Sequence, residues 1–117
     1  MRKTPQSYLD EALERQGLDS TPNRLKAKWS DGEYKYEVRL HEGESQYTDA
    51  NRIYRVQRQS VPNPDPKIQG TGKEYMDING KWHHESELTE VFRNESKNPK
   101  FNFEAVRDTH IPLDPSN

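Results

Sequence analysis

The chain has 117 residues, no cysteine and a formal net charge of −2, because 18 basic residues nearly balance 20 acidic ones. This length suits one domain, and the missing thiols exclude cysteine nucleophiles, cysteine-based zinc sites and disulfides. The composition is not the strongly basic one that is typical of nucleic-acid-binding domains, so any polyanion site must be a local basic patch.

The sequence pattern in the first part of the chain predicts one helix and three strands. Thr4 and Pro5 form a favourable helix start, and Gly17 can end that helix in the left-handed conformation. The apolar period then changes to two, which predicts strands over residues 24–29, 33–41 and 52–59. The dipeptide Asp31-Gly32 predicts a tight turn between the first two strands.

The second part begins with a loop over residues 60–72, which is rich in proline and glycine. The pattern then predicts, in chain order, strands over 73–77 and 81–85, a short helix or strand extension over 87–92, a helix over 103–108 and an extended end over 109–117. Asn79-Gly80 is the expected turn between the two strands, and Asn102 the expected helix cap. The fold class is therefore α+β: an N-terminal helix packed on a twisted antiparallel sheet of four to five strands, with a short C-terminal helix.

Few aliphatic side chains are available for the core of this domain. Hydrophobic residues make up 28% of the chain, but six Tyr and two Trp add large apolar faces. Together with the low net charge, these aromatic residues favour a folded domain over a disordered chain. No apolar run approaches the roughly 20 residues that a membrane-spanning helix needs, so we expect no membrane segment.

Histidines are the most informative candidates for chemistry, because imidazole can transfer protons near neutral pH. The chain has four: His41, His83, His84 and His110. In the predicted strand, Arg39 and His41 share a face, and Arg55 of the next strand should project the same way. Two guanidiniums beside an imidazole suit a phosphodiester, since arginine binds phosphate oxygens in bidentate fashion. The alternative for the two arginines is an ordinary solvated sheet face.

The remaining candidates come from the second half of the sheet and from the loops. His83 and His84 are adjacent in a strand, so at most one of them can point into a given cleft. Thr109, beside His110, offers a hydroxyl to a developing oxyanion. Three further residues are expected to bind substrate, Tyr47 by stacking on a base: they are Tyr47, Arg58 and Lys67.

Three stretches of the sequence carry a resemblance to a known class of proteins. They are KAKWSDGEYKYEVRLHEGESQYTDANRIYRVQRQ, GKEYMDINGKWHHESEL and NPKFNFEAVRDTHIPL. Together they resemble C-terminal toxin domains of bacterial polymorphic toxins, such as those of Rhs/YD-repeat and LXG exported proteins, over residues 21–113. The most specific blocks are YEVRLH, IYRVQRQ, NGKWHH and THIPL.

The resemblance implies a small metal-independent ribonuclease on a barnase/EndoU/colicin/RelE-like fold, with no cofactor. It implies that residues 1–117 form a single toxin domain, excised from the C-terminus of a longer exported protein and acting in the cytoplasm of a target bacterium. A cognate immunity protein is the expected partner besides RNA, and a monomer is the expected state. The site residues that it points to are Arg39, His41, Arg55, His83, His84, Thr109 and His110. The slight acidity departs from many nuclease toxins, which are basic.

The expected reaction is transesterification of RNA, with tRNA as one possible substrate. His41 or His110 would take the proton of the ribose 2′-hydroxyl, and the other, or one of His83 and His84, would protonate the 5′-oxygen. Arg39 and Arg55 would stabilise charge on the phosphate. Two alternatives remain: a metal-dependent DNase toxin with a histidine-rich site, and a non-catalytic binding module.

Overall fold

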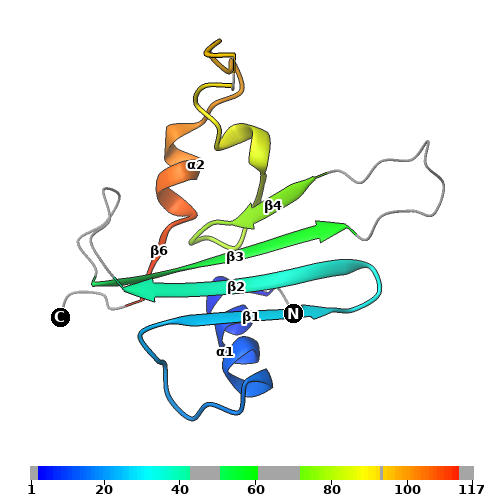
Figure 1. The fold of residues 1–117 in the computed structure, drawn as a ribbon, viewed down its shortest axis with the longest axis vertical. Helices are drawn as coiled ribbons and strands as arrows, with labels where there is room; N and C mark the ends of the chain where they lie inside the picture. Colours follow the sequence, from blue (N-terminus) through cyan, green and yellow to red (C-terminus); the bar gives the residue numbers. More distant parts are fainter. Residues whose placement is uncertain (1–2, 43–50, 61–71, 93, 114–117) are drawn as a thin grey trace.

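The structure is a computed structural model that describes residues 3–42, 51–60, 72–92 and 94–113. It confirms the α+β prediction (Figure 1). The elements, in chain order, are α1 (Pro5–Arg15), β1 (Leu25–Ser30), β2 (Tyr34–Glu42), β3 (Arg52–Ser60), β4 (Lys73–Met76), β5 (Trp82–His84), the 3₁₀ turn η1 (Glu85–Glu87), α2 (Phe103–Asp108) and β6 (Ile111–Pro112). The sheet is antiparallel with the strand order β1-β2-β3-β4-β5, and β6 pairs with β3.

Helix α1 begins and ends as its sequence predicts. Thr4 caps it, because its hydroxyl accepts the backbone N–H of Ser7 at 3.2 Å while the Ser7 hydroxyl oxygen accepts the N–H of Thr4 at 3.0 Å. Such a cap stabilises a helix by about 1 kcal/mol. Pro5 occupies the first turn, and Gly17 follows the helix end with a φ of +68°, which costs glycine little.

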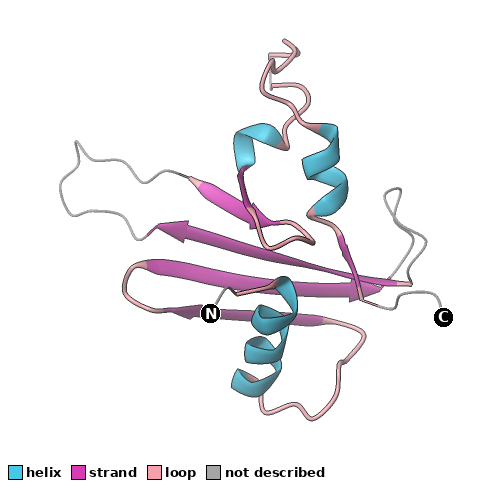
Figure 2. Ribbon diagram, turned by 180° about the vertical axis from the view of Figure 1, so that it is seen from behind, coloured by secondary structure: helices cyan, strands magenta, loops and turns pink. Residues whose placement is uncertain are grey.

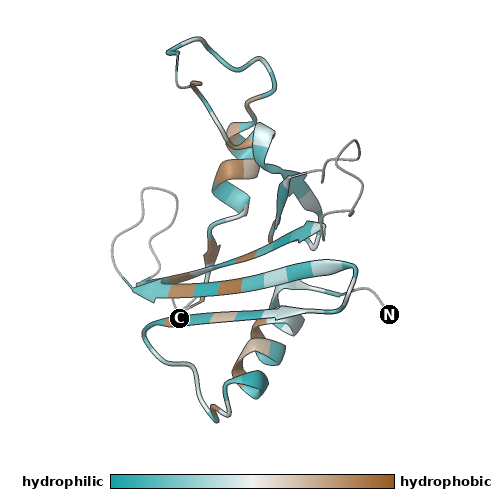
Figure 3. Cartoon of the chain, turned by 45° about the vertical axis from the view of Figure 1, so that its right-hand side comes forward, coloured by the Kyte–Doolittle hydropathy of each residue, from teal (hydrophilic) through white to brown (hydrophobic). Residues whose placement is uncertain are grey.

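The main core lies between α1 and one face of the sheet. Figure 2 shows α1 against this face, and Figure 3 shows apolar segments alternating with hydrophilic ones along the strands. Leu9 of α1 and Val38 and Val56 of the sheet are fully buried. The Tyr8 ring packs on Tyr36 with ring centroids 5.5 Å apart, so aromatic side chains do fill much of this small core.

The C-terminal end differs from its prediction in one element that matters for the site. The two-residue strand β6 pairs Tyr54 with Ile111 and Ile53 with Pro112. A strand this short, containing a proline, gives no periodicity to read, and Pro is tolerated at such an edge. Strand β5 is also shorter than predicted, because Glu85 already belongs to η1.

Strands β4 and β6 share the outer edge of β3, since β2 occupies the other edge. β4 pairs with residues 57–59 of β3, and β6 pairs with residues 53–54. Arg55 therefore stands where β4 gives way to β6, and one further step of the β6 register places His110 beside it. None of the helices in the described ranges is long and apolar enough to cross a membrane.

Candidate functional site

The polar face of the sheet, opposite α1, carries the predicted arginines. Arg39 of β2 and Arg55 of β3 are direct cross-strand partners, and His41 lies two residues beyond Arg39 on the same face. The predicted shared face is therefore confirmed. Like charges directly opposite each other destabilise a sheet, and a bound anion would relieve that repulsion.

A cleft of about 530 Å³ opens at the edge of β3, at the point where Arg55 stands. Its lining includes Arg55 of β3, Tyr75 of β4, His84 at the end of β5, and Val106 and His110 from α2 and the segment that follows it. The Arg55 guanidinium lies over the Tyr75 ring, 4.3 Å from its centroid. Four elements distant in sequence thus bring one guanidinium and two imidazoles to the same cleft.

His110 is half-buried, and a backbone hydrogen bond fixes the orientation of its ring. Its Nδ1 donates to the carbonyl oxygen of Val106 at 2.6 Å, so in the neutral ring the lone pair is on Nε2. Burial lowers the pKa of His110 below its usual 6.5, and the charges of Arg55 and His41 lower it further, against the opposing effect of the Val106 hydrogen bond. A neutral imidazole at neutral pH is the form that a general base requires.

His41 lies on the exposed surface of β2, outside the lining of the cleft. Its charge nevertheless contributes to the lowered pKa of His110. By strand register, the two histidines that the sequence placed in one site lie on the same face of the sheet, because His41 shares the face of Arg39 and Arg55 and the β6 register brings His110 to Arg55. A positive charge at the position of His41 therefore favours the neutral form of the His110 ring.

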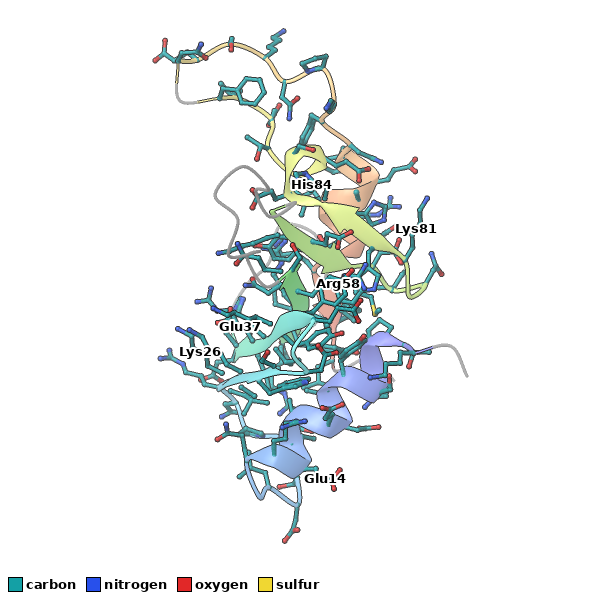
Figure 4. All side chains as sticks on the ribbon, turned by 90° about the vertical axis from the view of Figure 1, so that its right-hand side faces the viewer. Glu14, Lys26, Glu37, Arg58, Lys81 and His84 are labelled. Atoms are coloured by element: carbon teal, nitrogen blue, oxygen red, sulfur yellow. The ribbon has the colours of Figure 1, made fainter. Side chains whose placement is uncertain are left out.

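His84 is oriented by the turn that follows it. Its Nδ1 accepts the backbone N–H of Ser86 at 3.1 Å and lies 2.8 Å from the Ser86 hydroxyl oxygen. A nitrogen that accepts an N–H is unprotonated, so the neutral ring carries its proton on Nε2. Figure 4 shows His84 at the end of β5. His84 thus presents a hydrogen-bond donor rather than a base.

His83, which was predicted as a further site residue, lies outside the cleft. Its ring is buried; Nε2 is 2.7 Å from the Asp77 carboxylate and Nδ1 is 3.4 Å from that of Glu87. Asp77 also accepts the backbone N–H groups of Asn79 and Lys81. Nε2 therefore braces the turn between β4 and β5, and Nδ1 faces η1. This agrees with the expectation that at most one of the adjacent histidines points into a given cleft.

Thr109 does not line the cleft either, although it was predicted to stabilise an oxyanion. Its side chain is fully buried, and its hydroxyl donates to the Val106 carbonyl oxygen at 3.1 Å. That oxygen also accepts the bond from His110. Thr109 therefore helps to hold the end of α2 that orients His110.

Arg58 was predicted to bind substrate, and the structure places it on the opposite face of the sheet, toward α1. Its guanidinium lies 4.4 Å from the Tyr34 ring centroid and 4.2 Å from that of Trp82. Its Nε donates to the Glu74 carboxylate at 2.9 Å. This correction follows from strand alternation, because Arg55 and Arg58 are three residues apart. The other predicted substrate-binding residues, Tyr47 and Lys67, lie outside the described residues.

Sequence reasoning missed two parts of this face. Tyr75, which stacks on Arg55, lies in a predicted strand, but its face depends on a register that no local pattern specifies. Four lysines also lie on the open sheet face: Lys26, Lys28, Lys35 and Lys73. The alternation in the sequence KAKW was the available signal for the first two, since residues two apart share a face.

Among the described residues, no three His, Asp or Glu side chains gather in a group that could hold a metal ion. Asn98, which follows the His83-His84 pair in the chain, is buried and donates from its side-chain amide to the carbonyl oxygens of Ser86 and Thr89. Comparisons with protein families, with curated proteins and with solved structures found no match to this chain.

Proposed function

We propose that this chain is a metal-independent endoribonuclease, the toxin domain of a larger exported protein used in competition between bacteria. The observation that carries the catalytic part is the cleft at the β3 edge, where Arg55, His84 and His110 come together. The toxin part rests on the resemblance of the YEVRLH, IYRVQRQ, NGKWHH and THIPL blocks. A cognate immunity protein that blocks the cleft and a site of action in the target cytoplasm belong to the same proposal.

The reaction begins with His110 as the general base. Its Nε2 takes the proton of the ribose 2′-hydroxyl, while the Nδ1 bond to Val106 keeps the ring in the required tautomer. The 2′-oxygen then attacks the adjacent phosphorus, forming the new P–O bond as the bond to the 5′-oxygen breaks.

His41 is the acid in this scheme. It gives its proton to the departing 5′-oxygen, so the products are a 2′,3′-cyclic phosphate and a 5′-hydroxyl. We assign the acid role to His41 because it shares the face of the sheet on which the base stands. His84, whose Nδ1 accepts the Ser86 N–H, serves as a donor from Nε2. That donor, with Arg39 and Arg55, stabilises the charge that develops on the non-bridging oxygens.

The test uses purified protein with total tRNA, with a mixed RNA pool and with DNA, each with and without EDTA. We expect RNA cleavage that persists in EDTA, intact DNA, and fragments whose masses correspond to cyclic phosphate ends. Cleavage of DNA that EDTA abolishes would instead favour the metal-dependent DNase. Absence of cleavage under all these conditions, with a folded protein, would overturn the enzymatic proposal and favour a binding module.

A further inference from the structure

The open face of the sheet holds a second feature, which we name the lysine face. It is a shallow depression of about 580 Å³ whose cationic lining residues are Lys26, Lys28, Lys35, Arg39 and Lys73. Among the described residues that line it, the single carboxylate is Glu37, which lies 3.5 Å from the Lys28 ammonium and 3.9 Å from the Arg39 guanidinium. Five cations against one carboxylate make this a positively charged surface on a chain whose net charge is −2.

The cations are arranged by strand register in rows that run across the sheet. Lys26 of β1 is the partner of Arg39 in β2, and Arg39 is the partner of Arg55 in β3. The β6 register, one step extended, continues this row to His110. Neighbouring strands are about 4.8 Å apart, so the row forms a continuous line of positive charge that ends at the catalytic cleft.

Negative charge lies on the other side of the molecule. The outer surface of α1 carries Asp10, Glu11 and Glu14 around a separate depression. Figure 4 shows Lys26 and Glu37 on one side of the sheet and α1, which carries Glu14, on the other. The nearly balanced overall charge therefore averages two surfaces of opposite sign, and a polyanion would be drawn to the lysine face rather than to the outer surface of α1.

The shape of the lysine face favours an extended chain of anions over a small ligand. Its cations come from three strands, β1, β2 and β4, with the neutral side chains Gln57 and Gln59 of β3 among them, and they do not converge on one point. A phosphodiester backbone supplies regularly spaced negative charges along such a row. A single strand fits the adjoining cleft better than a duplex does, because its bases are free to leave the stack.

We propose that the lysine face is the track for single-stranded RNA, with the scissile phosphate at Arg55 and Arg39 and the neighbouring phosphates further along the same row, toward Lys26. The inference rests on the proposed function, since the strand on the track is the substrate of the cleft. It adds the strandedness of the substrate and the direction in which it crosses the sheet, from β1 toward β3.

The experiment measures binding separately from cleavage. The probe is a fluorescein-labelled 2′-O-methyl oligoribonucleotide of mixed sequence, which has no free 2′-hydroxyl and cannot be cut by transesterification. Its anisotropy is titrated at salt concentrations from roughly 50 to 300 mM. The test variant is Lys26→Gln/Lys28→Gln/Lys35→Gln. The control variant, Lys81→Gln/Lys97→Gln/Lys100→Gln, removes the same charge from exposed lysines elsewhere.

We expect the salt dependence of log K to fall by about 0.7 to 2 in the test variant, because each lost contact with a single strand contributes about 0.7 to the slope. Lys26 stands on the row itself, and Lys28 and Lys35 flank it. The control variant should keep the wild-type slope. Both variants should keep the wild-type thermal unfolding midpoint, since all six lysines are exposed.

Equal slopes in the two variants would overturn the track, as would tighter binding of a duplex of the same length or no binding of the probe by the wild type. The last result, together with capture of acidic proteins, would identify the lysine face as a protein-docking surface. If the probe binds through these lysines but unmodified RNA is not cleaved, the proposed ribonuclease activity is refuted and the proposed RNA-binding track stands. If RNA is cleaved but binding does not depend on these lysines, the track is refuted and the ribonuclease activity stands.

Discussion

Arg55 and Arg58 lie three residues apart on β3 and have opposite roles. Arg58 faces α1, pairs with Glu74 and lies between the rings of Tyr34 and Trp82. Arg55 faces the open side, where it stacks on Tyr75, lines the cleft and stands opposite a second arginine. The same residue type thus pairs with a carboxylate on one face and lies beside two imidazoles, opposite another arginine, on the other.

The comparison shows that the two faces of the sheet have different roles: the α1 face stabilises the fold, and the open face is suited to chemistry. On the α1 face, each fully buried aliphatic side chain contributes roughly 1.5–3 kcal/mol, and Arg58 is paired with Glu74. On the open face, Arg39 opposes Arg55, an arrangement that costs stability and prepares a site for an anion. We therefore expect substitutions on the open face to change cleavage and substitutions on the α1 face to change folding.

The largest effect on cleavage is expected from His110→Gln. Removing a positioned general base should lower the cleavage rate about 100- to 10,000-fold. The thermal unfolding midpoint, measured on the same sample, should change little, because Gln can still fill the half-buried site. A folded variant that cleaves at the wild-type rate would contradict the assignment of His110 as the base.

Two variants, Arg55→Gln and Arg58→Gln, each measured for both cleavage and stability, test the difference between the two faces directly. Loss of the charge at Arg55 should lower kcat by about 100- to 1,000-fold, as removal of a transition-state donor does. Loss of Arg58 should reduce the free energy of unfolding by about 2 kcal/mol, from one partly buried ion pair and two cation–π contacts. Urea titration and single-turnover cleavage, applied to both variants, give the two readouts.

The opposite pattern, in which Arg58→Gln lowers kcat in fully folded protein and Arg55→Gln does not, would reverse the roles of the two faces. A matched control is Arg107→Gln, since Arg107 is exposed and its partner Asp108 is its sequence neighbour. Exposed ion pairs contribute about 0–1 kcal/mol, so this variant should match the wild type in both measurements.

Much of the fold could be predicted because its local signals agree with its packing. The Thr4 cap, the Asp31-Gly32 and Asn79-Gly80 turns and the alternation of Tyr36 and Val38 with charged residues all act over a few residues. Strand β6 could not be predicted, because two residues carry no period and their pairing depends on contacts more than fifty residues away in sequence.

The site could be predicted in its residue types but not in the roles of its members. Alternation placed Arg39 and Arg55 on one face, and the structure confirms it. His83 and His84 have different roles because Asp77 and Glu87 contact the His83 ring. Thr109 is buried because its hydroxyl bonds to Val106 of α2. These are tertiary contacts without a local signature. The lysine face was missed because the overall composition averages it against the acidic surface of α1.

Thr109→Val should have a smaller effect than the arginine substitutions. It tests whether Thr109 stabilises the fold or takes part in the reaction. The substitution removes the hydroxyl at nearly constant volume, while the Val106 oxygen still accepts the bond from His110. We expect a loss of about 1 kcal/mol in the free energy of unfolding and a cleavage rate within a few-fold of the wild type. Thr109→Ser, which keeps the hydroxyl, is the control. A rate loss of about 100-fold or more with unchanged stability would restore Thr109 as an oxyanion donor.

The smallest expected effect is a shift in the titration of His110 when His41 is replaced by Gln. Burial, then the charges of Arg55 and His41, lower the pKa of His110, so removing the His41 charge should move its NMR titration midpoint upward. Because the lowered pKa means that the unfolded chain binds the proton more tightly, His110 reduces stability as pH falls from about 6.5 toward its folded pKa. In the His41→Gln variant this loss should begin at the same pH and be smaller in total. An unchanged midpoint would show that His41 and His110 do not interact across the open face, and the acid would then have to be sought elsewhere in the site.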